Sequence, residues 1–130
     1  MIYLWIALGS ALGGMGRYWL TGVISNSFGQ TFPWGTLIVN VTGSLAIGFI
    51  FTATMGPGAR LAVNPTFTQF MTIGICGGYT TFSSFSLQTL NLARDGEWLY
   101  AGLNVALSIV FCLAAVWLGH TLGQLLNPRL

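Results

Sequence analysis

The chain has 130 residues, of which 54% are hydrophobic and only 5% charged, and its formal net charge is +2. A soluble domain typically carries about 25% charged residues, so this composition cannot cover a water-exposed surface, and lipid is the expected solvent for most of the chain. The small net charge also gives no support to nucleic-acid binding. We expect one membrane domain over residues 1–130.

Four apolar segments are predicted to be helices that cross a bilayer. They cover about residues 2–24, 34–55, 67–92 and 98–122, and each exceeds the ~20 residues that a spanning helix needs. Connectors rich in Gly, Pro and polar residues separate them. The first segment lacks the basic region of a signal peptide, so we interpret it as a retained helix.

The four arginines are divided evenly between the two sides that these spans define. Arg60 and Arg129 fall on the side of the termini, whereas Arg94 falls on the other side and Arg17 near it. The positive-inside rule therefore favours neither orientation. A chain without this bias can insert both ways. Since four helices alone form a thin wall for a pore, we expect an antiparallel, dual-topology homodimer.

The first segment holds the only candidate for a membrane-embedded charge, Arg17. A positive charge near a pore entrance attracts anions, although a long Arg side chain can also extend to the interface. Gly9 and Gly13, like Gly119 and Gly123 in the fourth segment, have the spacing that permits close helix packing.

Polar residues recur every four positions in the second and fourth segments. These stripes are Thr36, Asn40 and Ser44 in the second segment, and Asn104, Ser108 and Cys112 in the fourth. Residues at this spacing share one helix face, and a buried amide must be hydrogen-bonded. The stripes therefore face protein or a polar pathway. Hydrogen bonds that merely join helices are the alternative.

The third segment contains two adjacent glycines followed by hydroxyl residues, which are poor helix formers. We predict that this helix is broken near its middle, with freed carbonyls that protein, water or an ion must satisfy. An unbroken helix with a close contact at Gly74 and Gly78 is the alternative. Phe82 and Phe85 share a face just beyond the glycines, and aromatic ring edges are electropositive.

The spans lack the residues that other classes of membrane protein and enzymes need for their function. The only two acids, Asp95 and Glu97, lie in one connector, whereas cation pathways and proton-coupled transporters usually place an acid inside the membrane. No cluster has metal-site spacing, and no pairing of a nucleophile with a base is evident. A pathway for a small anion, rather than an enzyme, is the expectation that remains.

Three stretches of sequence resemble the Fluc (CrcB) family of fluoride channels. They are residues 77–86 (GGYTTFSSFS), residues 35–43 (GTLIVNVTG) and residues 13–18 (GGMGRY). The first of these is highly specific, and the resemblance extends over nearly the whole chain. Three positions depart from the family pattern: Gln88 stands where an acid is common, Tyr79 is larger than expected, and Cys112 replaces a hydroxyl of some relatives.

The resemblance implies an all-α membrane protein of four spans, assembled as an antiparallel homodimer with two pores at the subunit interface. The residues that would line the pores and contact fluoride are Asn40, Phe82, Phe85, Ser83, Ser84, Ser108 and Thr36. Arg17 would lie in the vestibule. The backbone carbonyls of Gly77 and Thr80 from both subunits would bind a structural Na⁺ at the dimer centre.

The function that follows from the resemblance is passive, fluoride-selective export across a bacterial inner membrane, with fluoride, lipid and a second copy of the chain as partners. Two other functions remain open. A small dual-topology multidrug exporter has a similar size, but it needs a membrane carboxylate. A tetraspan protein that does not transport would use its polar stripes for packing only.

Overall fold

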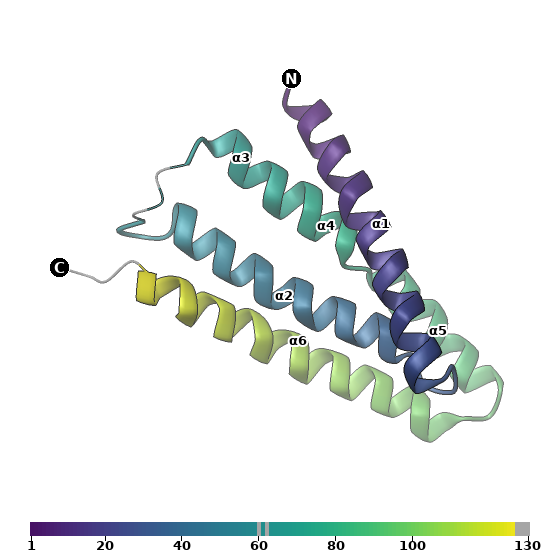
Figure 1. Ribbon diagram of the computed structural model, residues 1–130. Coiled ribbons are helices and arrows are strands. Elements are labelled where there is room, and N and C mark those ends of the chain that lie inside the picture. The colour runs from purple at the N-terminus through teal and green to yellow at the C-terminus, as the bar shows by residue number, and fades with distance from the viewer. Residues whose placement is uncertain (60, 62, 127–130) are drawn as a thin grey trace.

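The computed structural model describes residues 1–59, 61 and 63–126, and all regular structure within them is helical (Figure 1). The continuous helices are α1 (Ile2–Phe28), α2 (Trp34–Met55) and α6 (Trp98–Leu126). Between α2 and α6 lie four short pieces: α3 (Pro65–Gln69), the π-helix η1 (Phe70–Cys76), α4 (Gly77–Tyr79) and α5 (Phe82–Arg94). The all-helical fold predicted from the sequence is confirmed.

The chain runs between the two ends of the molecule four times. Figure 1 shows the α1–α2 and α5–α6 connectors at one end, and the α2–α3 connector with the end of α6 at the other. Helix α1 continues to Phe28 and α6 to Leu126, past the ends predicted at residues 24 and 122. Arg60 and Arg129, on which the charge count depends, lie outside the described residues.

Helices α2 and α6 lie side by side and form the most extensive helix pair. Both are long and apolar enough to cross a membrane by length and composition. Their contact is close because Gly48 and Gly119 have no side chains: an added Cβ would meet the Val116 carbonyl or the Leu45 carbonyl of the opposite helix. Near the end of α6, His120 Nδ1 lies 2.8 Å from Thr52 Oγ1 of α2.

Helix α1 packs in the same way against the third segment, with backbone touching backbone. A Cβ on Gly9 would lie 2.9 Å from Gly74 Cα, and one on Gly13 would lie 2.7 Å from the Tyr79 amide. Gly78 faces the main chain of Ser10 in the same contact. The Gly9–Gly13 and Gly119–Gly123 spacings therefore serve close packing within one chain.

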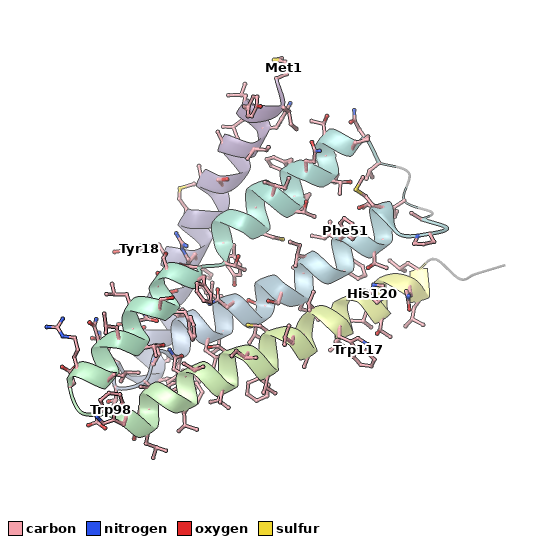
Figure 2. All side chains as sticks on the ribbon, turned by 180° about the vertical axis from the view of Figure 1, so that it is seen from behind. Met1, Tyr18, Phe51, Trp98, Trp117 and His120 are labelled. Carbon is pink, nitrogen blue, oxygen red and sulfur yellow. The ribbon has the colours of Figure 1, made fainter. Side chains whose placement is uncertain are left out.

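The outside of the molecule is apolar, unlike that of a soluble protein, and several polar side chains are buried. The buried polar residues are Thr36, Thr52, Thr68, Thr72, Thr81, Asn104 and Ser108. Large apolar and aromatic side chains cover the outside instead; Trp117 and Tyr18, for example, point away from the bundle (Figure 2). A surface of this kind is stable in lipid or against another protein chain, not in water.

The third segment is interrupted after Tyr79, as predicted. Thr80 (φ −80°, ψ 158°) and Thr81 (φ −153°, ψ 115°) have extended backbone, and a new helix begins at Phe82. Thr81 caps that helix, because its Oγ1 accepts the Ser84 amide at 3.1 Å. The glycine contact that was the alternative is also present, since Gly74 and Gly78 pack on α1, but the helix ends after Tyr79, just past this contact.

Candidate functional site

The interruption in the third segment is held from α2 by one side chain, that of Asn40. Its Oδ1 accepts the Thr81 amide at 2.7 Å, and its Nδ2 donates to the Thr81 carbonyl at 3.0 Å. In a continuous helix the Thr81 amide would donate to the carbonyl of Gly77. Asn40 takes the place of that bond, so the Gly77 carbonyl loses its helical donor.

The neighbouring residue, Thr80, ends the short helix α4 and is held from α1. Its amide and its Oγ1 both donate to the Cys76 carbonyl at 3.0 Å. Its own carbonyl oxygen accepts a hydrogen bond of 3.2 Å from Arg17 Nη1. The two extended residues of the break are therefore fixed by side chains from two different helices.

An apolar pocket of about 400 Å³ lies beside the break. Residues from α2, the third segment and α6 line it, and they include Asn40, Gly77, Thr80, Phe82, Phe85 and Ser108. The rings of Phe82 and Phe85 are 5.2 Å apart between centroids and inclined by 48°. Phe82 is 79% exposed, which is unusual for an aromatic ring unless lipid, a ligand or another chain covers it.

An open groove of about 870 Å³ lies on the other side of the break, between α1, the start of α2 and α5. Arg17, Thr36, Ser84 and Gln88 are among the residues that line it. Arg17 brings a positive charge to this groove, and the hydroxyl and amide groups can donate hydrogen bonds. The groove is therefore suited to receive an anion.

Thr81 lines both the pocket and the groove, so the two cavities flank the break on either side of this residue. Nine of the ten residues that the sequence singled out line one cavity or the other. The exception is Ser83, which lies on the exposed side of α5 with its Oγ 3.2 Å from Thr81 Oγ1. Together the cavities present amide, hydroxyl and guanidinium donors and aromatic rings without a carboxylate.

Two residues of the polar stripe on α6 have different surroundings. Asn104 is fully buried, and its Nδ2 donates to Thr89 Oγ1 of α5 at 2.9 Å. For Asn104 the polar stripe therefore has the alternative role given above, a hydrogen bond that joins two helices. Ser108, one turn further on, is 8% exposed and lines the pocket, and its Oγ has no hydrogen-bond partner among the described residues.

The backbone oxygens at the break fit a hard monovalent cation. Among the described residues there is no group of three His, Cys, Asp or Glu side chains that could hold a metal ion. The oxygens that the break itself offers are those of backbone carbonyls. The Gly77 carbonyl lacks its helical donor, and the Thr80 carbonyl keeps a second lone pair beside the Arg17 bond. Both residues line the same pocket.

Thr81 is the important residue that the sequence analysis did not single out, although it stands in the run of hydroxyls used to predict the break. The structure also explains how Tyr79 is accommodated. Its hydroxyl lies 2.9 Å from Thr42 Oγ1. Its ring lies next to Gly43, where an added Cβ would be 3.1 Å from Tyr79 Cδ1.

Comparison with known proteins gives a consistent result. The family described as "CrcB-like protein, Camphor Resistance (CrcB)" matches residues 4–120. The fluoride-specific ion channel FluC of Rhodospirillum rubrum is 55% identical over 127 residues, with 98% of each chain covered. Proteins of the same name from Methylocella silvestris and Opitutus terrae are 56% and 57% identical, and the alignments cover 98% and 97% of this chain and 96% and 95% of theirs.

Proposed function

The chain belongs to the CrcB-like family of membrane proteins, and we propose that it is a passive channel that exports fluoride selectively through a bacterial inner membrane. The observation that carries this proposal is that two cavities flank the break at Thr81. One contains the Arg17 charge, and the other contains Asn40 and the paired rings of Phe82 and Phe85.

Fluoride gives up strongly bound water only if the path offers comparable donors. Asn40 uses one Nδ2 hydrogen on Thr81, and its second is available to an anion. Ser108 Oγ is also available, since no described residue bonds to it. The edges of the Phe82 and Phe85 rings add positive potential without a full charge. Chloride, which is larger, is excluded by the fit among these groups.

The driving force is the membrane potential, not ATP or a proton gradient. Hydrogen fluoride crosses a bilayer as a neutral weak acid and dissociates inside, so fluoride accumulates in a cell exposed to acid. A negative-inside potential then expels the anion, with about 2.3 kcal/mol per charge for each 100 mV. Arg17 in the groove raises the local concentration of anions.

The proposed assembly is an antiparallel homodimer with two pores and a structural Na⁺. The exposed ring of Phe82 and the open, apolar pocket support a second copy at this face. Gly77 and Thr80 would hold the Na⁺ through backbone oxygens. When bound, the ion neutralises the partial negative charge at the end of α4.

Fluoride efflux from reconstituted liposomes tests the function. Liposomes loaded with potassium fluoride should release it when valinomycin is added, as a fluoride electrode records, and potassium chloride should give no comparable chloride release. Release that needs a proton gradient would indicate an exporter of the multidrug type, and no release at all would indicate a protein that serves packing only. Cross-linking of the purified protein, with antiparallel and parallel cysteine pairs compared, tests the dimer separately.

A further inference from the structure

Arg17 makes a hydrogen bond that its expected role of attracting anions in the vestibule does not need. Its Nη1 donates to the carbonyl oxygen of Thr80, 63 positions along the chain, at 3.2 Å. The same oxygen belongs to the pair of backbone groups that fit a cation. The guanidinium therefore already occupies one lone pair of a proposed cation ligand.

The position of the Arg17 backbone is set by the packing of α1 and not by the hydrogen bond of its side chain. Gly13, one turn earlier on α1, lies against the main chain at Ile75 and Tyr79. Thr80 is likewise held independently, through its amide and Oγ1 on the Cys76 carbonyl. Because Thr80 is fixed by these other contacts, loss of the Arg17 bond should leave the Thr80 carbonyl close to its present orientation.

No carboxylate of this chain offsets the Arg17 charge there. The chain has two acids, and both Asp95 and Glu97 lie in or beside the α5–α6 connector, after the end of α5 at Arg94. The groups that face Arg17 in the groove are neutral, among them Thr36, Ser84 and Gln88. A cation on the Thr80 oxygen would therefore be repelled by a nearby guanidinium whose charge no carboxylate offsets.

We propose that Arg17 weakens the binding of Na⁺ at the break and so sets the affinity of that site, in addition to attracting anions. This inference rests on the proposed Na⁺ site. Like charges that share one ligand in a partly buried setting change an affinity by about tenfold or more. Arg17 thus keeps the cation exchangeable, where neutral carbonyls alone would hold it more tightly.

The test is a Na⁺ titration of thermal stability in detergent, with N-methylglucamine chloride replacing NaCl at constant ionic strength. Wild type should gain stability with Na⁺. In Arg17→Gln the Na⁺ concentration that gives half of this gain (the midpoint) should fall by about tenfold, because the positive charge is gone. Arg17→Met is a second neutral variant, with an unbranched side chain like that of Arg. Arg17→Lys keeps the positive charge but lacks the planar guanidinium group.

Arg17→Lys distinguishes charge from hydrogen bonding. If charge sets the affinity, its midpoint stays within about threefold of wild type while both neutral variants shift downward. Midpoints that rise in Lys and Gln alike would show that Arg17 supports the site, and unchanged midpoints would show that it is uninvolved; either result overturns the proposal. Arg94→Gln, at the exposed end of α5, is the matched control and should not shift.

The same titration separates this inference from the function on which it rests. A wild-type protein that conducts fluoride but gains no stability from Na⁺ would refute the cation site and this inference with it, and would leave the channel function standing. A wild-type protein that responds to Na⁺ without conducting fluoride would refute the channel and leave the role of Arg17 open to the variants above.

Discussion

The side-chain amide of Asn40 pairs with the backbone of Thr81 in both directions, at 2.7 Å through Oδ1 and 3.0 Å through Nδ2. Two residues on neighbouring antiparallel β-strands pair through two hydrogen bonds of this kind. Here a side-chain amide takes the place of one of those residues, and its partner is an extended residue that lies between two helices. Asn40 therefore has a structural role at the break as well as the pore-lining role predicted for it.

Replacing Asn40 by Leu, which has a similar size but no polar group, leaves the buried amide and carbonyl of Thr81 unpaired. We expect a loss of about 3 kcal/mol in stability, since each buried unsatisfied group costs about 1–3 kcal/mol, together with loss of fluoride flux. Thermal unfolding in detergent and liposome efflux measure the two effects. Asn91→Leu, at an exposed position on α5, is the control. Equal unfolding temperatures for the two variants would contradict the role of Asn40 in holding the break.

The paired rings are expected to be needed for flux but not for folding. Phe82→Ile and Phe85→Ile remove the electropositive ring edges and keep an apolar side chain. Fluoride efflux should fall by at least about tenfold, which corresponds to about 1.4 kcal/mol, while the unfolding temperature changes little at the exposed Phe82. Electrode traces from liposomes of matched protein content provide the measurement.

Phe67→Ile is the matched control for these two rings. Phe67 is an exposed aromatic of the same segment, in α3, and lines neither cavity. It should conduct like wild type. Full activity in Phe82→Ile and Phe85→Ile together would remove the rings from the fluoride path.

Ser108 separates a conduction role from a packing role. Its buried hydroxyl has no partner among the described residues, so Ser108→Ala breaks no hydrogen bond within them and should not lower the unfolding temperature. Flux should nevertheless decrease several-fold, because one donor of about 1 kcal/mol is lost from the path. Reduced stability with unchanged flux would indicate that Ser108 serves packing, as Asn104 does through Thr89.

The contact between α1 and the third segment should tolerate no side chain at Gly13. A Cβ there would be 2.7 Å from the Tyr79 amide nitrogen and would also meet the Ile75 carbonyl. Gly13→Ala should therefore lower stability by about 1–3 kcal/mol. Gly14→Ala is the control because an added Cβ has no neighbour within 4 Å.

The α2–α6 pair offers the same comparison independently. An added Cβ at Gly119 would meet the Leu45 carbonyl, whereas one at Gly102 would have open space. Gly119→Ala should therefore unfold at a lower temperature than Gly102→Ala. Equal temperatures within either pair of variants would mean that the helices separate without loss and that these contacts do not hold the bundle.

The helices and the existence of the break could be predicted from the sequence, because apolar length and a run of poor helix formers are local properties. The place of the break could not. It falls at Thr80 and Thr81, after the glycines, where Asn40 of the distant helix α2 pairs with the backbone of Thr81. The π-helical turn η1 gave no local signal either.

The polar stripes could be recognised, but their division of roles required the structure. In α2, Thr36 faces the groove, whereas Asn40 and Ser44 line the pocket. In α6, Asn104 joins two helices and Ser108 faces the pocket. A period of four residues gives a shared face, and only tertiary packing decides what that face meets. The dimer and its Na⁺ stay predictions.

At Gly13 and Gly78 the main chains of α1 and the third segment touch directly, and no flexible side chain lies between them to absorb a displacement. Closely packed backbones transmit strain instead of dissipating it. A bilayer that is too thin or too thick tilts a spanning helix, and a tilt of α1 would carry Arg17 with it and pull on the Thr80 carbonyl. We therefore expect the thickness of the surrounding lipid to act on the break that lies between the two cavities.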